Sequence, residues 1–353
     1  MGFYEEKLQK FRDALAARGY AVRVANAAVV DGQACPVTVG FPSDVLGQNS
    51  FIGVPDVHLS DGSAGDIFLD GNPDNALRFT RVLGAIDSYM DAESASAYLL
   101  QLGDWYDVWR AVGADATQAD FARIDGVPAY QALLELDKRL GMAHLIGNHD
   151  ASFKHALPDR RVADGARFRF GFGLMNSNGR VFALHGHQTD TVQGVPSPDS
   201  DQRAVWLATL AAKYVTSEAR SLQDFFDKEG TSAGAALHWL GALVGLNRPD
   251  PVPIPRPRIP TPAGFTGSFV DREESAALVR IAVGACAKRY AAPEPLQLLI
   301  VGHSHKPCIA AVPHPTSGKP VVIVDGGSWV QGAAQIVFGA ANRVSVFDIV
   351  AAH

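Results

Sequence analysis

The chain of 353 residues is long enough for one large domain with an insertion, or for two domains. A hydrophobic fraction of 47% and a charged fraction of 19% exclude wholesale disorder. The net charge of -6 is mild, so nucleic acid held through phosphate contacts is not the favoured partner, although a local basic patch stays compatible with this composition.

The first fifty residues carry little functional signal. Residues 2–17 alternate charged and apolar side chains, which predicts an amphipathic surface helix, and they lack the apolar run of a secretory signal. Residues 21–39 predict strands or a hairpin that turns at Asp31 and Gly32. We expect residues 1–50 to pack as an arm on the core or across a subunit interface.

The cysteines are few and widely spaced, at Cys35, Cys286 and Cys308. This spacing predicts neither a disulfide framework nor a thiolate zinc site. No apolar run reaches membrane-spanning length. Together these features favour a cytoplasmic protein.

Several short apolar runs rich in Val, Ile and Leu stop abruptly at Gly, Asp or His, which predicts strands. Most of them lack polar alternation, and this is typical of strands buried on both faces. The predicted strands are residues 51–54, 98–102, 143–146, 181–184, 296–301 and 321–324.

Helices are predicted between the first three of these strands. Residues 73–90 place apolar side chains at helical spacing after Asn72, a suitable N-cap. Residues 127–140 begin near Pro128 and are followed by Gly141, as helices often are. Strand, helix, strand, helix is the pattern of a layered α/β domain.

Polar side chains follow five of the predicted strands, directly after each strand ends. In layered α/β folds, ligands bind outside the carboxyl ends of strands, so we expect these loops to converge on one site. The polar residues are Asp56 and His58, then Asp104 and Asp107, then Asn148, His149 and Asp150, then His185 and His187, and finally His303 and His305.

The types of these residues indicate a metal site. Oxygen ligands from Asp and Asn, mixed with imidazoles and without thiolates, suit divalent manganese, iron or zinc, whereas magnesium alone would need fewer histidines. The set exceeds what one ion requires, and a carboxylate such as Asp104 can bridge two ions. The sequence therefore predicts two divalent metal ions.

In chain order these blocks read DVH, GDWYD, GNHD, H and GHSH. The ordered set resembles the calcineurin-like metallophosphoesterase family over residues 51–190 and 296–330. The resemblance implies an α/β fold of the metallophosphoesterase type, a β-sandwich flanked by helices with metals at the strand ends. By motif position it implies one metal on Asp56, His58 and His305, a second on Asn148, His185 and His303, and a bridging Asp104.

The activity implied by the resemblance is that of a metal-dependent phosphoric ester hydrolase. Two cations would lower the pKa of a bridging water and present hydroxide to a phosphomonoester, a phosphodiester or a pyrophosphate. His149 would protonate the leaving oxygen, and Asp150 would orient its imidazole and raise its pKa. Asp107 is expected to fix a ligand by hydrogen bonding.

The alternative is a non-catalytic metal-binding scaffold protein that keeps a phosphoesterase fold without turnover. Such a protein is expected to lack some ligands or the acid, and all of them are present here. The sequence therefore favours the enzyme.

Neighbouring residues carry weaker predictions. His187 lines the second metal, hydrogen-bonds to a ligand or fills the loop, and His144 is expected to be a core histidine. Core packing is favoured over stacking on a substrate for the aromatic residues that follow Asp104. These aromatic residues are Trp105, Tyr106 and Trp109. Arg110 is expected either to contact a substrate phosphate or to lie in solvent. The remaining histidines are expected at the surface or in packing, and they are His155, His238, His314 and His353.

Residues 191–295 are predicted to be a largely helical insertion between two parts of the core, residues 51–190 and 296–353. Residues 205–226 and 235–246 have helical patterns, and the second is apolar nearly all round. Burial is favoured for it, and an apolar patch for an acyl chain or a membrane surface is the alternative.

The second half of the insertion begins with a Pro-rich stretch, residues 247–262, that predicts a stiff extended segment. A rigid strut is favoured over a peptide-recognition motif or a return path across the surface. Residues 270–290 then predict a helix in which Asp271 and Glu274 resemble a capping box. Because the insertion separates two ligand blocks, it could overhang the site as a lid.

The blocks DVHLSD and GDWYDVW most resemble the branch that contains UDP-diacylglucosamine pyrophosphohydrolases, where inserted helices receive acyl chains. That branch usually has Arg in place of His149 and a shorter insertion. A lipid-linked pyrophosphate is therefore one candidate substrate beside a soluble phosphomonoester or phosphodiester.

Overall fold

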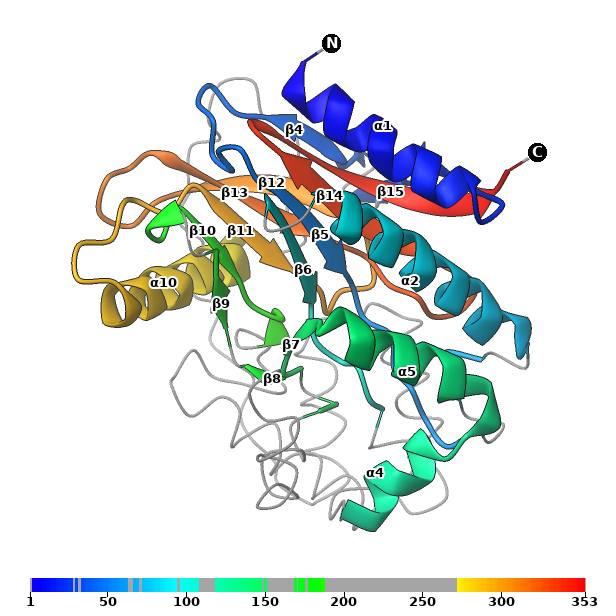
Figure 1. Cartoon of the computed structure of the whole chain (residues 1–353). Coiled ribbons are helices and arrows are strands. Elements are labelled where there is room, and N and C mark those ends of the chain that lie inside the picture. Colours follow the sequence, from blue (N-terminus) through cyan, green and yellow to red (C-terminus); the bar gives the residue numbers. More distant parts are fainter. Residues whose placement is uncertain are drawn as a thin grey trace, which may run out of the picture.

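A computed structural model describes the chain as a mixed α/β structure with two mixed sheets and several helices (Figure 1). The described residues are 2–27, 29–30, 33–62, 66–69, 72–93, 96–107, 118–147, 149–150, 168–169, 171–174, 177–187 and 272–352. No helix in these ranges is long and apolar enough to cross a membrane.

The main sheet has eight strands, in the order β1-β15-β14-β5-β6-β7-β8, with β4 also paired to β15. Its strands β5 to β8 are parallel neighbours, whereas β14, β15, β1 and β4 pair antiparallel. The strands are β1 (Tyr20–Val24), β4 (Thr38–Gly40), β5 (Ser50–Val54), β6 (Ala97–Gln101), β7 (Ala143–Leu145), β8 (Phe168–Arg169), β14 (Gln335–Ala340) and β15 (Arg343–Ala351).

The second sheet has five strands, in the order β12-β13-β11-β10-β9. The pairs β10–β11 and β11–β13 are parallel, and the two outer pairs are antiparallel. The strands are β9 (Phe172–Gly173), β10 (Val181–Ala183), β11 (Leu298–Val301), β12 (Cys308–Pro313) and β13 (Pro320–Asp325). A separate hairpin pairs β2 (Val29–Val30) with β3 (Gln33–Ala34).

The helices begin and end where the sequence provides local signals. The side chain of Asn72 accepts a hydrogen bond from the Asp74 backbone N–H at 3.0 Å, at the start of α2. Gly141 adopts a left-handed φ of 58° after α5, a conformation that glycine reaches without strain. The helices are α1 (Phe3–Ala16), α2 (Asp74–Glu93), α4 (Gln118–Asp125), the 3-10 turn η2 (Pro128–Tyr130), α5 (Gln131–Leu140) and α10 (Arg272–Arg289).

Three apolar clusters arrange these elements as helices, main sheet, second sheet and helix. Successive side chains of a strand face opposite sides, so each buried strand feeds two clusters. In β11, Leu298 and Ile300 pack between the two sheets, whereas Leu299 and Val301 pack against α10. A third cluster joins the main sheet to α1, α2 and α5, which lie together on its other face (Figure 1).

Every strand predicted from the apolar runs is present, as β5, β6, β7, β10, β11 and β13. The expected helices are present as α1, α2 and η2–α5, and α10 falls within the helix expected over residues 270–290. The N-terminal segment enters the main sheet through β1 and β4. The other helices and the Pro-rich strut of the insertion lie outside the described residues, as do the proposed cap residue Asp271 and the turn residues Asp31 and Gly32.

Candidate metal centre

The predicted polar residues meet where parallel strands of both sheets end. Asp56 and His58 follow β5, and Asp104 follows β6 of the main sheet. The second sheet contributes the histidines after β10 and β11. Potential metal-binding atoms in this region form three groups, each with all atoms within 4.8 Å of one another. The groups are Asp56, His58 and His305; His58, Asp104 and His149; and Asp104, His185 and His303.

The first group surrounds His58. Its Nε2 lies 3.0 Å from Nε2 of His305, which in turn lies 3.2 Å from Oδ2 of Asp56. Two imidazole nitrogens and a carboxylate oxygen thus point at one small volume, which is the donor set of a divalent metal site. The structure brings together the three residues expected to hold one ion.

The last group surrounds Asp104. Oδ2 of this carboxylate lies 3.1 Å from Nε2 of His185 and 3.7 Å from Nε2 of His58. Asp104 therefore stands between the two outer groups, the position that a bridging carboxylate requires. Asn148, the remaining predicted ligand, lies outside the described residues, between the described Gly147 and His149.

The carboxylates of this centre are buried, and no Lys or Arg of the described ranges pairs with them. Asp56 and Asp104 are 0% and 1% exposed, and within the described ranges their ion-pair partners are histidines alone. Oδ1 of Asp56 has no hydrogen-bond partner there either. Burying such charge is strongly unfavourable unless a cation compensates it. The cluster therefore fits divalent cations, judged from its donors and its buried carboxylates.

The electrostatics differ among the predicted ligands. Burial opposes the ionisation of Asp104, but His185 and His149 hold the pKa of this carboxyl well below its usual range. Burial and the neighbouring His149 lower the pKa of His58, which favours the neutral imidazole that metals bind. Burial opposes protonation of His185, but Asp104 and Asp56 raise its pKa.

Backbone groups orient the ligands. Asp104 Oδ1 accepts a hydrogen bond from the His149 backbone N–H at 2.9 Å, and Asp56 Oδ2 accepts one from His303 N–H at 2.9 Å. Nδ1 of His185 lies 2.9 Å from the carbonyl oxygen of Leu102, which directs Nε2 toward Asp104. Such contacts fix the tautomer and direction of a ligand.

Four of the predicted ligands have left-handed backbone conformations that non-glycine residues rarely adopt. The φ angles are 59° at His58, 51° at Asp104, 79° at His303 and 57° at His305. Each such residue costs on the order of 1–3 kcal/mol, and strain of this kind gathers at functional sites. The main chain is thus bent to bring these side chains together.

Glycines allow the side chains of the predicted ligands to lie close to the neighbouring backbone, and these glycines were not among the predicted site residues. A Cβ on Gly147 would lie 2.0 Å from Oδ1 of Asp104, and one on Gly302 would lie 2.2 Å from Oδ1 of Asp56. A Cβ on Gly103 would lie 2.3 Å from Nδ1 of His185. Their signal was visible in the sequence, because each glycine directly precedes a predicted ligand in GD, GN or GH.

The expected pairing of Asp150 with His149 is wrong. The oxygens of Asp150 accept backbone hydrogen bonds from Trp105, Tyr106 and Gly147 at 3.1, 2.8 and 3.0 Å. Nδ1 of His149 instead lies 2.9 Å from Oδ1 of Asp107. Asp150 thus accepts hydrogen bonds from three backbone N–H groups, one in its own turn and two in the loop that follows Asp104. Its carboxylate therefore holds these two loops together. Asp107 takes the orienting position.

Asp107 also approaches the first group, since its Oδ2 lies 3.4 Å from Nδ1 of His58. Burial opposes its ionisation, but His149 and His58 strongly lower the pKa of Asp107. The expectation that Asp107 fixes a ligand by hydrogen bonding agrees with these contacts.

The weaker predictions have mixed outcomes. His144 is a buried core histidine whose Nε2 lies 3.0 Å from Asp137 Oδ1, and Trp105 and Tyr106 pack in the core, as expected. His187 is buried with its ring centroid 5.4 Å from that of His185, and its role stays a prediction. His314 is buried in a turn. Trp109, Arg110, His155, His238 and His353 lie outside the described residues.

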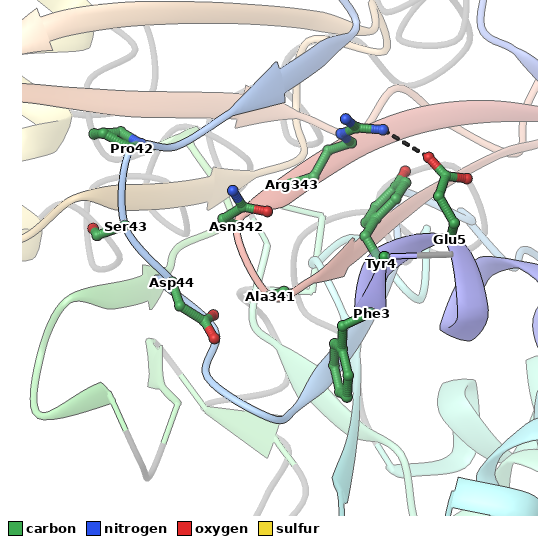
Figure 2. A pocket seen from close by; sticks show the side chains of 10 residues that line it. Phe3, Tyr4, Glu5, Pro42, Ser43, Asp44, Ala341, Asn342 and Arg343 are labelled. Atoms are coloured by element: carbon green, nitrogen blue, oxygen red, sulfur yellow. Dashed lines mark hydrogen bonds and ion pairs between the residues drawn. The ribbon is translucent and has the colours of Figure 1, made fainter.

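A separate hollow of about 320 Å³ lies between the start of α1, residues 42–44 and the turn from β14 to β15 (Figure 2). An ion pair of 2.7 Å joins Arg343 Nη1 to Glu5 Oε1 beside it. Ser50, the first residue of β5, pairs with Ala340, so the hollow lies at the opposite end of β5 from Asp56. It contains none of the predicted ligands.

No protein-family model matches this chain, and no curated protein sequence matches it either.

Proposed function

We propose that this protein is a dinuclear metal-dependent phosphoesterase with a β-sandwich of the calcineurin-like metallophosphoesterase type. The observation that carries the proposal is the pair of outer ligand groups joined through Asp104 at the strand ends. The ordered sequence blocks supply the reaction class, since the same residues are arranged in the order found in that family.

The residues present fit two ions. Asp56, His58 and His305 would hold one, and His185, His303 and Asn148 would hold the other, with Asp104 shared between them. The mixture of carboxylate, amide and imidazole donors favours manganese, iron or zinc. When bound, such ions supply positive charge that polarises phosphate oxygens and lowers the pKa of water.

The chain itself supplies a general acid. His149 stands beside the ligand group, within the set that contains His58 and Asp104. Its Nδ1 is held by Asp107, which leaves Nε2 as the atom that can donate a proton to the leaving oxygen. Asp107 also stabilises the protonated imidazole, because its carboxylate is buried beside it.

The test is manganese-dependent hydrolysis of paired artificial phosphomonoester and phosphodiester substrates, with metal content measured on the same samples. We expect Asp104→Asn to reduce bound metal and to abolish turnover. Asp87→Asn is the matched control, since Asp87 pairs with Arg139 on the surface of α2. Its metal content and turnover should equal those of the wild type.

Each result separates the enzyme from a scaffold. Turnover that disappears in Asp104→Asn and survives in Asp87→Asn supports the phosphoesterase, and the preferred ester narrows the substrate class. A wild type that binds two metal ions but hydrolyses neither ester, nor a lipid-linked pyrophosphate, would instead support a metal-binding scaffold. A wild type that binds no divalent metal would overturn both.

A further inference from the structure

Two cysteines that are far apart in the sequence meet in the fold. Cys35 follows β3, and Cys308 is the first residue of β12. Both are buried, at 4% and 3% exposure, and their side chains are hydrogen-bonded to each other. The backbones also meet, since Ile309 N–H donates to the Pro36 carbonyl oxygen at 2.8 Å. All three cysteines are described, and none forms a disulfide.

The segment that carries Cys35 connects the edge strand β12 of the second sheet to β15 of the main sheet. The Pro36 carbonyl bonds to β12 of the second sheet, and the Val37 carbonyl accepts from Val346 N–H of β15 in the main sheet at 2.8 Å. A covalent bond from Cys35 to β12 would therefore fasten the N-terminal segment across both sheets. Cys308 also lies three positions after His305, so the bond would anchor the end of the loop that carries this predicted ligand.

We propose that Cys35 and Cys308 are a redox-sensitive pair that forms a disulfide when the protein meets a small oxidised disulfide such as oxidised glutathione. One cysteine thiolate attacks the small disulfide and releases one small thiol, which leaves a mixed disulfide on the protein. The second cysteine then attacks the protein sulfur of that mixed disulfide and releases the second small thiol. Two protein thiols are oxidised and one small disulfide is reduced to two thiols.

The environment of the two cysteines makes the first step of this exchange slow and favours the second step, which closes the disulfide. Burial, the hydrogen bond with Cys35 and the nearby Asp325 raise the pKa of the Cys308 thiol, which lowers its thiolate fraction. Because the two thiols are hydrogen-bonded to each other, the second step should need little backbone movement. The bond would close a loop of about three quarters of the 353 residues, and a cross-link that closes a long loop restricts the unfolded state more than one that closes a short loop.

Cys286 provides an internal control. It is buried in α10, in the cluster that packs α10 against the second sheet, with its Sγ 3.6 Å from the Gly179 carbonyl oxygen. Burial raises the pKa of its thiol to about 11. It is thus a buried cysteine of low reactivity, but it has no second cysteine against it among the described contacts.

The experiment exposes the purified full-length protein to oxidised glutathione over a time course, blocks the remaining thiols by alkylation and maps the peptides by mass spectrometry. We expect alkylatable cysteines to fall from three to one, with Cys35 linked to Cys308 and Cys286 still alkylated. Cys286→Ser should form the same link, whereas Cys308→Ser should form none. The oxidised wild type should unfold at a temperature roughly 5 °C or more above the reduced form, and the reductant dithiothreitol should reverse this shift.

A second condition gives the oxidant better access to the two buried thiols. The oxidation is repeated in urea below the unfolding transition, where local opening is more frequent while the fold is retained. The proposal is overturned if Cys35 and Cys308 remain thiols or stable glutathione adducts under both conditions. A link that involves Cys286 would overturn it as well.

Discussion

Oδ1 of Asp56 faces Gly302 so closely that any larger residue there would collide with it. We predict that Gly302→Ala weakens manganese binding about 10-fold or more, because the new Cβ would displace a carboxylate that the predicted site depends on. Competition with a fluorescent chelator measures the affinity. Circular dichroism on the same variant checks that the fold is retained.

Gly284→Ala is the matched control for that substitution. A Cβ on Gly284, within α10, meets no atom within 4 Å, and alanine favours helix by about 0.5–1 kcal/mol. This variant should bind metal as the wild type does and should be slightly more stable. If both variants bind manganese normally, the close packing around Asp56 has no part in metal binding.

The His149–Asp107 pair leads to a prediction about leaving groups. A general acid matters most when the leaving oxygen is strongly basic, so His149→Ala should slow hydrolysis of an alkyl phosphate by roughly 10²–10⁴-fold. Hydrolysis of a nitrophenyl phosphate, whose leaving oxygen needs no proton, should slow far less. Asp107→Asn should show the same selective pattern more weakly, because it disturbs the acid through its orientation.

Turnover numbers for both substrates, measured at saturating manganese, check this prediction. An equal loss on both substrates would mean that His149 supports the structure or binds metal and does not act as the acid. Metal content of each variant separates these two explanations.

The sequence predicted which residues would come together at the strand ends, but it did not predict the groups that support them. Asp56, His58, Asp104, His185, His303 and His305 could be identified because their types and order are distinctive. Asp150 was assigned to His149 because the two are adjacent in the chain, whereas the partner in space is Asp107, on another strand-end loop. Nothing in a linear sequence distinguishes these alternatives, since both carboxylates follow buried strands.

At the scale of elements, α1 and α2 are joined by a buried ion pair. Lys7 donates to Glu93, whose side chain is 1% exposed, and Lys10 Nζ lies 3.0 Å from its Oε1. Burial opposes the ionisation of Glu93, but the hydrogen bonds from Lys7 and Lys10 outweigh it and lower its pKa. We predict that Glu93→Gln lowers the free energy of unfolding by about 3 kcal/mol at neutral pH, because Lys7 would be left as a buried charge.

The pH dependence of this effect has a defined sign. Since the pKa of Glu93 is lower in the folded state, its stabilising contribution is fully present above the unfolded value of 4.5 and is lost as the pH falls through the folded value. Urea unfolding at neutral pH and in acid should therefore show that the difference in free energy of unfolding between wild type and Glu93→Gln is smaller in acid. If this difference stays constant with pH, the effect of Glu93→Gln comes from packing and not from the charge of Glu93.

Glu6→Gln is the control for that pair. Glu6 also contacts Lys10, but its side chain is 55% exposed, so solvent screens the interaction. Its substitution should change the free energy of unfolding by less than about 0.5 kcal/mol.

The predicted elements show why some strands were found and others were not. The buried strands β5 and β11 are apolar on both faces and read clearly as short runs. The two-residue strands β8 and β9 are too short for any periodicity. β14 and β15 were not predicted, because their stretch of the chain contains no motif, although most of their apolar residues are buried.

At the scale of the whole molecule, the candidate metal centre joins the two sheets. Asp56, His58 and Asp104 come from the main sheet, whereas His185, His303 and His305 come from the second. We predict that manganese added to chelator-treated protein raises the unfolding temperature by roughly 5–10 °C at a hundredfold excess over Kd, since binding to the folded state alone adds about 2.7 kcal/mol per site.

Thermal unfolding across a manganese series measures this shift. The Asp104→Asn variant should show a much smaller response, because it lacks the shared carboxylate. A wild-type unfolding temperature that does not change with manganese, while the ion is demonstrably bound, would mean that the site also exists in the unfolded chain.

The layered α/β class followed from the alternation of strands and helices, but the pairing of the sheets did not. The order β14-β5-β6 places a C-terminal strand beside an N-terminal one, and no local pattern encodes such a contact. Cys35 and Cys308 illustrate the same limit, because their wide spacing concealed that they touch.

The pairing of β1 with β15 also determines when the protein can finish folding. Tyr20 lies opposite Ala351, and β14 fills the position between β5 and β15. During synthesis, the open edge of β5 must therefore wait for β14, and β1 must wait until residue 351 has left the ribosome. An unpaired edge strand is a template for aggregation during that interval, so production of this protein should depend on slow translation or on chaperones that cover β5.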